Sequence, residues 1–277
     1  MASSTPSLLE LLVFFHDAIL VSIMVGAILA PIGLFLHLRR NIFLGAALPQ
    51  IAGFSFVAGD VLSIPKWIAA GIALIVFAIV SNIKKWNKNL GINSETIIAL
   101  GYSVAMAGTI LLLALTNAEA HASELLLKGS VLTAKCSDTQ TLAWIGIPLI
   151  LLLYLFQKRL FLISIDPEMA RILGIHVNFY EFMLNGIFGI SIILTLIEAG
   201  ALACFAFMLI PSLCAQALCN RVSRMFLVSE IIGILGAAGG ITISLAYDLP
   251  AGPAMVIFLI VLWIVSLLAG FLWNGKR

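Results

Sequence analysis

Charged side chains are scarce in this chain: Asp, Glu, Lys and Arg make up only 10% of its 277 residues. Soluble globular domains carry about 25% charged residues, so the deficit excludes an ordinary water-soluble protein. The net charge of +2 is spread between apolar blocks, which excludes a basic nucleic-acid-binding surface. Hydrophobic residues take up 62% of the chain, and we predict an integral membrane protein.

Cysteine motifs and nucleotide-binding motifs are also missing. The four cysteines have no CxxC spacing, so neither a structural zinc site nor a disulfide framework is indicated. There is no GxxxxGK[ST] phosphate-binding loop, so the chain is not predicted to hydrolyse ATP by that route. We therefore expect a non-enzymatic chain with no catalytic residues and no cofactor of its own, and any ATP-driven work would need another subunit.

Long apolar blocks replace the missing charges and predict an all-α polytopic protein with about nine transmembrane helices. A spanning helix needs about 20 apolar residues, and continuous rather than alternating apolar blocks argue against membrane strands. The seventh block is short and contains Pro211, so eight full spans plus one short or broken span describe the pattern equally well. The expected spans are 14–38, 42–62, 66–83, 95–116, 139–157, 179–198, 200–217, 226–246 and 253–273.

Basic residues predict the orientation of the chain. With nine crossings, five basic groups fall on one side of the membrane, which the positive-inside rule makes cytoplasmic. The C-terminus is then cytoplasmic and the N-terminus extracytoplasmic. Residues 1–277 are predicted to form one transmembrane domain, with an extracytoplasmic loop at 117–138 and a cytoplasmic loop at 160–178. The basic groups are Arg39-Arg40, Lys84 to Lys88, Lys158-Arg159 with Arg171, Arg221 with Arg224, and Lys276-Arg277.

The cytoplasmic loop contains a short polar segment with the signals of a capped helix. Asp166 can accept hydrogen bonds from the first backbone N–H groups, and Pro167 suits the first helical position. Glu168 favours the positive end of the helix dipole, and Gly174 is a natural stop. A membrane protein that places a capped helix in a loop is predicted to dock a partner there; the alternative is an amphipathic loop without a partner.

The second span contains features unusual for a lipid-facing helix. Pro49 removes a backbone hydrogen bond near mid-span, and the neutral polar Gln50 is expected to face another helix or a pore. Small residues around them, Ala46 included, permit close approach of another backbone. The alternative is a kinked helix that serves packing alone.

Few ionisable groups lie at membrane depth, and none forms a relay of carboxylates, which disfavours a secondary transporter. Asp60, Glu181, Glu198 and Glu230 are interpreted as polar helix ends. In the outer loop, His121 and Glu124 are three residues apart and would share a helix face, so they are candidate ligands for a divalent metal. A solvated loop without metal is the alternative.

Six segments, taken in order, resemble the membrane permease subunits of ABC importers for zinc, manganese and ferrous iron, a family related to the siderophore and cobalamin permeases. The resemblance covers residues from about 20 to 270. Each segment alone is weakly specific, but their order and membrane register together are specific. The segments are 38–45 (LRRNIFLG), 94–101 (SETIIALG), 125–132 (LLLKGSVL), 166–175 (DPEMARILGI), 200–211 (GALACFAFMLIP) and 247–253 (YDLPAGP).

The resemblance implies a type II ABC importer permease in a bacterial plasma (inner) membrane, working as a homodimer. It further implies two ATPase subunits, which would hold ATP and Mg²⁺, and an extracytoplasmic solute-binding protein. The segment from Ile165 to Gly174 would enter a cleft of the ATPase as the coupling helix. The residues so assigned to ATPase coupling are Asp166, Glu168, Ala170, Arg171, Leu173 and Gly174.

One segment departs from the family pattern. Metal-importing members carry Asp-Ala-Leu-Ser-His in the second helix, where the acid and the imidazole can bind a passing cation, but this chain reads Ala46-Ala47-Leu48-Pro49-Gln50. Alanine cannot coordinate a metal, and a glutamine carbonyl suits zinc poorly. Ala46, Pro49 and Gln50 remain the predicted transport pathway. The cargo is predicted to be a divalent transition metal; the alternatives are a chelate or another small solute, or a scaffold that has lost its pore.

Overall fold

The computed structural model describes residues 14–86, 94–116, 129 and 131–274, and every regular element in these ranges is a helix. This confirms the predicted all-α membrane protein. The predicted ligands His121 and Glu124, and most of the predicted outer loop, lie outside the described residues. The elements are α2 (His16–Leu38), α3 (Ile42–Val61), α4 (Lys66–Trp86), α5 (Ser94–Thr116), η3 (Val131–Thr133), α7 (Cys136–Ile165), α8 (Pro167–Ile172), α9 (Val177–Leu218), α10 (Val222–Tyr247) and α11 (Ala251–Asn274).

Seven of these helices are long and apolar enough to cross a membrane, and a shorter apolar stretch within α4, Trp67–Val80, adds to them. Most begin and end within a few residues of the predicted spans. The largest difference is α7, which continues to Ile165 instead of ending near 157. Lys158 and Arg159 do not interrupt it, because a charged side chain ends a span without ending a helix. The chain between α7 and α9 is residues 166–176, which lie within the predicted loop at 160–178.

The helix α9 reverses direction at Gly200. Its 42 residues would measure about 63 Å as one straight helix, about twice the hydrocarbon thickness of a bilayer. Gly200 has φ 77° and ψ 161°, which only glycine adopts readily. Thr195 Oγ1 and Cys204 Sγ lie 3.6 Å apart, whereas residues nine apart in a continuous helix are separated by about 13 Å. We call the two halves α9a (177–199) and α9b (201–218); they correspond to the sixth and seventh predicted spans.

Prolines do not break the helices here. Pro49 lies inside α3, and Pro211 lies inside α9b, with helical assignment on both sides. The short seventh span therefore owes its shape to Gly200, which supplies a positive φ, and not to Pro211. Because a proline removes one backbone hydrogen bond but leaves φ in the helical range, packing against neighbouring helices can hold it in place.

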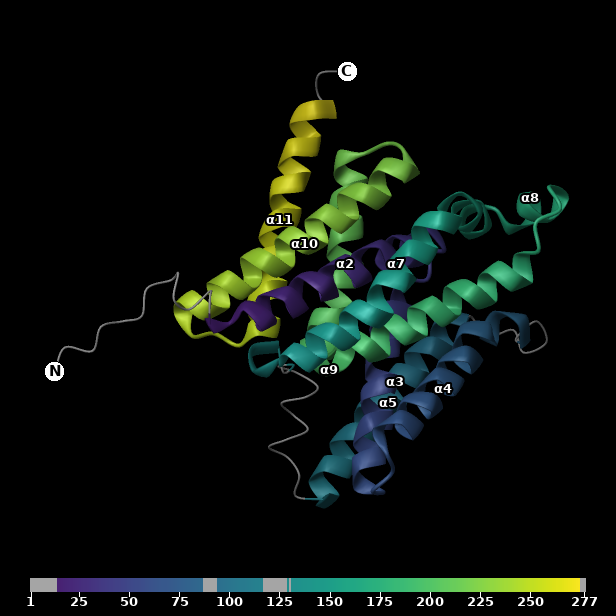
Figure 1. Cartoon of the computed structure of the whole chain (residues 1–277). Helices are drawn as coiled ribbons and strands as arrows, with labels where there is room; N and C mark the ends of the chain where they lie inside the picture. The colour runs from purple at the N-terminus through teal and green to yellow at the C-terminus, as the bar shows by residue number, and fades with distance from the viewer. Residues whose placement is uncertain (1–13, 87–93, 117–128, 130, 275–277) are drawn as a thin grey trace.

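The helices α2 and α9 form the centre of the bundle. α2 packs against α7, α9 and α10, while α9 also contacts α3, α4 and α11 (Figure 1). α3, α4 and α5 form a separate group on one side of α9, and α10 and α11 form a hairpin on the other. At one end of the bundle the rings of Phe35 and Phe161 stack and Phe226 packs edge-on against both, so the end of α2, the end of α7 and the start of α10 meet there.

That end of the bundle also carries α8, and we call it the α8 face. The opposite face is the one where α2 begins at His16. Four of the basic residues used to predict orientation, Arg40, Arg159, Arg171 and Arg224, belong to segments at the α8 face. All four are exposed.

Candidate functional site: the capped helix α8 and the central face of α3

The start of α8 is capped by the side chain that the sequence indicates. Asp166 Oδ1 accepts hydrogen bonds from the backbone N–H groups of Glu168, at 3.1 Å, and Met169, at 2.9 Å. Pro167 occupies the first helical position and has no N–H that needs a partner. Glu168 lies in the first turn, where its charge suits the positive end of the helix dipole. The predicted capped helix is confirmed as local structure.

The end of α8 is closed by a glycine in a left-handed conformation. Gly174 has φ +75°, and its N–H donates to the carbonyl of Arg171 at 3.0 Å. The N–H of Ile175 donates to the carbonyl of Ala170, also at 3.0 Å. These two bonds form a Schellman motif, which satisfies the carbonyl groups left over at a helix end. α8 is thus a rigid unit whose shape depends on its own residues.

The surface of α8 is partly apolar. Ala170 is fully buried and holds α8 against the bundle, whereas Ile172 is 80% exposed and Leu173 is 58% exposed. Exposed apolar side chains on a short rigid helix are typical of a docking surface. Arg171 lies in the last turn, beside these residues, and adds a positive charge. Figure 1 shows α8 at the edge of the bundle, away from the middle of α3.

Polar contacts beneath α8 join three helices. Arg39, the residue that ends α2, donates from Nε to Ser164 Oγ at 3.4 Å and from Nη1 to Asn185 Oδ1 at 3.3 Å. Burial lowers the pKa of Arg39, and the nearby charge of Glu181 raises it. Ser164 belongs to the last turn of α7, and Asn185 to α9a. The sequence marks Arg39 only as one of a basic pair; its burial and its partners come from the fold.

A second contact joins α7 to the start of α9. The guanidinium of Arg159 lies 5.6 Å from the ring centre of Tyr180 and donates a hydrogen bond to its hydroxyl group. Tyr180 is buried, although it lies near a helix end. Together with the hydrogen bonds of Arg39, this contact holds α2, α7 and α9a together next to α8.

The predicted pathway residues lie in the first half of α3. Ala46 and Gln50 are four residues apart, so they share one face of the helix, and both are half-buried. Pro49 is buried and points elsewhere, which makes it a packing residue. The structure therefore places two of the three predicted pathway residues together on a partly open face. It does not place α8 beside them.

Glycines let α2 meet the backbone of α9b and let α3 meet its side chains. A Cβ atom on Gly33 would lie 1.6 Å from the carbonyl oxygen of Met208, so only glycine fits there. On Gly45, a Cβ would lie 3.3 Å from the side chain of Leu36 and 3.8 Å from that of Met208. α2 and α3 therefore both pack against α9b. Small-residue contacts of this kind are typical of membrane helix interfaces.

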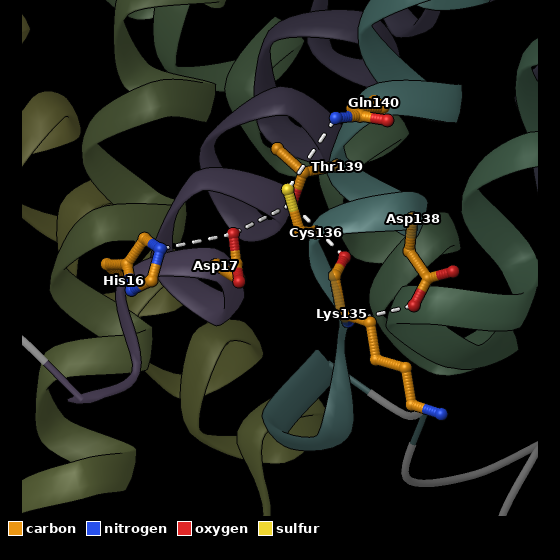
Figure 2. A network of polar contacts seen from close by, with 7 residues as sticks. All are labelled: His16, Asp17, Lys135, Cys136, Asp138, Thr139 and Gln140. Atoms are coloured by element: carbon orange, nitrogen blue, oxygen red, sulfur yellow. Dashed lines mark hydrogen bonds and ion pairs between the residues drawn. The ribbon is translucent and has the colours of Figure 1, made fainter.

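At the opposite face, a polar network joins the starts of α2 and α7. Figure 2 shows His16 beside Asp17, with His16 Nε2 3.4 Å from Asp17 Oδ1. Thr139 Oγ1 donates to the same carboxylate oxygen at 3.5 Å, and the backbone N–H of Lys135 donates to Asp138 at 2.8 Å. Among the described residues, no three His, Cys, Asp or Glu side chains gather closely enough to hold a metal. The network joins the start of α2 to the start of α7 through the hydrogen bond of Thr139 to Asp17.

The point where α9 reverses is covered by Gly129, which lies between α5 and η3 in the chain. A Cβ on Gly129, which has φ +65°, would lie 2.3 Å from the carbonyl oxygen of Glu198 and 2.5 Å from the carbonyl carbon of Ala199. Gly129 belongs to the family-like segment 125–132, and Gly200 begins the segment 200–211. Each segment therefore contains a glycine, but only the fold brings Gly129 against the backbone just before Gly200.

One carboxylate within the spanning helices has a fixed partner. The hydroxyl group of Tyr154, on α7, donates to Glu230 on α10. The ring of Tyr154 also packs edge-on against Phe226, with 4.9 Å between the ring centres. The interpretation of Glu230 as a polar helix end is incomplete, because its side chain ties two helices together.

A family profile and several known transport proteins match this chain over nearly its full length. The profile of the family described as "ABC 3 transport family" matches residues 12–270. The manganese transport system membrane protein MntC of Listeria monocytogenes is 28% identical over 273 residues, which cover 95% of each chain. The high-affinity zinc uptake system membrane protein ZnuB of Haemophilus influenzae is 27% identical, over 90% of this chain and 95% of its own.

A solved structure agrees with the fold. PsaBC from Streptococcus pneumoniae, in complex with Fab, superposes with a TM-score of 0.79 over 91% of this chain and 90% of that one, at 23% identity. At this identity, the likeness concerns the arrangement of helices.

Proposed function

Because the chain belongs to the ABC 3 transport family, we propose that it is the membrane-spanning permease subunit of an ATP-driven importer. The observation that carries the proposal is α8, a helix capped at both ends by its own residues and exposed on one face of the bundle. A rigid exposed helix can pass the closure of an ATPase to the membrane helices as a rigid-body movement. Asp166, Glu168 and Gly174 would shape it.

The expected partners follow from this role. The α8 face is proposed to be cytoplasmic, because the basic residues of four segments collect there. α8 would dock on an ATPase subunit that supplies ATP and Mg²⁺, and a second permease copy would complete the transport pathway. An extracytoplasmic binding protein would deliver the solute to the opposite face of a bacterial plasma membrane.

The cargo is proposed to be a divalent transition metal ion. The relatives named above are a manganese transport protein and a zinc uptake protein, and they align over nearly the whole chain. The ion would pass the face of α3 that carries Ala46 and Gln50. Gln50 offers an amide oxygen but no charge, so it would contact a passing ion weakly.

A second candidate cargo is a metal chelate or another small solute. The observation that favours it is the pair at 46 and 50, which lacks the acid and imidazole that the family resemblance implies. A chelate brings its own ligands, so it needs no charged ligands in the pathway.

Uptake by the assembled complex tests the role and the cargo. The chain is co-expressed with its ATPase and binding protein, and uptake of Mn²⁺ and Zn²⁺ into vesicles is measured with and without ATP. Gln50→Ala is expected to lower uptake by about 2–10-fold, the equivalent of one polar contact. Gln140→Ala, exposed at the start of α7, serves as the control and should leave uptake unchanged.

The double variant Ala46→Asp with Gln50→His separates the two cargoes. Added ligands should lower the concentration of a bare ion that gives half-maximal uptake, because both groups bind divalent transition metals. An unchanged value favours the chelate. A wild-type complex that binds ATPase but moves no solute would identify a scaffold, and a chain that co-purifies with no ATPase would refute the permease role.

A further inference from the structure

Arg39 occupies a position that the proposed function does not yet use. It ends α2, and α3 begins three residues later at Ile42. Its side chain is half-buried and reaches Ser164 on α7 and Asn185 on α9a. The next residue, Arg40, has the same charge but is exposed. Two adjacent arginines thus have different environments.

The two partners of Arg39 lie on either side of the α8 segment. Ser164 precedes the cap residue Asp166 by two positions, and Asn185 lies about two turns into α9. α8 and its flanking residues, 166–176, are attached to the bundle through these two helices. A guanidinium group presents its donors in a rigid planar fork and so fixes two acceptors relative to each other, whereas the ammonium group of a lysine sits on a flexible stem. Arg39 therefore links both supports of α8 to the connection between α2 and α3.

The same connection contains further buried polar atoms. Arg39 Nη2, His37 Nδ1 and Asn41 Oδ1 all lie out of reach of solvent within five residues of one another in the chain. They accompany the two hydrogen bonds of Arg39 to Ser164 and Asn185. A change in the position of either partner would therefore shift the α2–α3 connection through Arg39.

We propose that Arg39 is a positioning residue that transmits movement of α8 to α3, through its hydrogen bonds to Ser164 and Asn185. The proposal rests on the proposed permease function. When the ATPase moves α8, the last turn of α7 and the start of α9a move with it. Arg39 then carries the α2–α3 connection along, and with it the first turns of α3, which lead to Ala46 and Gln50.

The test uses the full complex in vesicles and compares Arg39→Gln with Arg40→Gln. Both changes remove one positive charge from the same connection, and only the first removes the link. The number of Mn²⁺ ions transported per ATP hydrolysed is expected to fall by about 3–10-fold in Arg39→Gln, within the range of coupling effects seen for such residues. Arg40→Gln should keep the wild-type ratio. Equal ratios in the two variants would overturn the proposal.

Further measurements exclude a merely structural effect. Arg39→Lys keeps the charge but loses the rigid fork of donors, so its ratio should fall as well, with ATPase co-purification unchanged. If Arg39→Gln fails to assemble, Ser164→Ala and Asn185→Ala take its place, since each removes one bond. Each should lower the ratio; wild-type ratios in both would overturn the proposal.

Hydrogen exchange gives a readout that does not depend on the cargo. In the wild-type complex, ATP should change the exchange of the backbone amides of residues 42–50, and in Arg39→Gln this change should be lost. A change that persists in Arg39→Gln would contradict the link, whichever solute is carried. A wild-type chain that moves neither Mn²⁺ nor Zn²⁺ but shows the ATP-dependent exchange refutes the cargo alone. A chain that binds no ATPase refutes both proposals.

Discussion

α8 and the first half of α3 differ in what determines their structure. α8 has six residues, most of them exposed, and its ends are closed by Asp166 and Gly174 from its own segment. α3 has 20 residues, most of them buried or half-buried, and its first half is held by contacts with α9 and other helices. A local substitution in α8 should therefore change α8 alone. In α3 the response depends on neighbouring helices.

This difference suits the two proposed tasks. A docking helix must keep one shape while its partner changes, so its shape should depend on local capping. A transport pathway must open and close, so its shape should depend on contacts that can be exchanged between helices. α9 joins the two regions: α9a starts directly after the α8 segment, and α9b packs against α2 and α3.

The largest effect is expected from Gly200→Ala, which tests the element that both regions share. Gly200 is buried and has φ 77° and ψ 161°, where an alanine is strained. We expect the free energy of unfolding to fall by about 2–3 kcal/mol. Thermal unfolding of the purified chain in detergent measures it. Gly186→Ala is the matched control on α9a, because a Cβ there meets no atom within 4 Å; equal unfolding midpoints for the two variants would contradict the strained reversal.

A smaller effect is expected from Gly174→Ala, which tests whether α8 is determined locally. The positive φ costs alanine about 1–2 kcal/mol, so the end of α8 should fray. ATPase stimulation by the permease should decrease, while the thermal unfolding midpoint of the whole chain stays nearly unchanged. Gly174→Asn is the control, since asparagine tolerates this conformation. Unchanged stimulation in Gly174→Ala would argue against docking by α8.

The smallest effect is expected from Tyr154→Phe, which removes one hydrogen bond between spanning helices and keeps the ring. Hydrogen bonds between membrane helices contribute about 0.6 kcal/mol on average, so the unfolding midpoint should fall slightly. Transport per ATP should stay at the wild-type value, because the bond joins α7 to α10 and reaches neither α8 nor α3. A large loss of transport would show that Glu230 takes part in the pathway.

Much of this molecule could be predicted from the sequence. The predicted spans fall close to the helices because about 20 consecutive apolar residues meet the thickness of a bilayer. The cap of α8 was also predictable, since Asp166, Pro167 and Gly174 act on backbone groups within a few residues of themselves. The predicted span ends near 157 and the helix α7 continues to Ile165, because Lys158 and Arg159 predict a membrane boundary and not the end of a helix.

The roles of three residues could not be predicted, because each depends on contacts that only the folded chain makes. Gly200 begins a family-like segment, but its positive φ accompanies the packing of α9a against α9b, where Thr195 meets Cys204. Gly129 fits because the backbone of Glu198 and Ala199 leaves no room for a Cβ. Arg39 is one of two adjacent arginines, and the sequence gives no reason why the first is half-buried and the second exposed.

The sequence by itself determined the membrane class, the approximate spans, the capped helix α8 and the absence of an acid and an imidazole at positions 46 and 50. These properties depend on hydropathy, on local hydrogen bonds and on side-chain chemistry, all of which act over a few residues. The tertiary structure decided where α9 reverses, which arginine becomes a link and which residues of α3 share an open face. Those outcomes depend on close packing that only the folded chain creates: Thr195 meets Cys204 across the reversal of α9, and Arg39 meets Ser164 and Asn185, more than a hundred residues away.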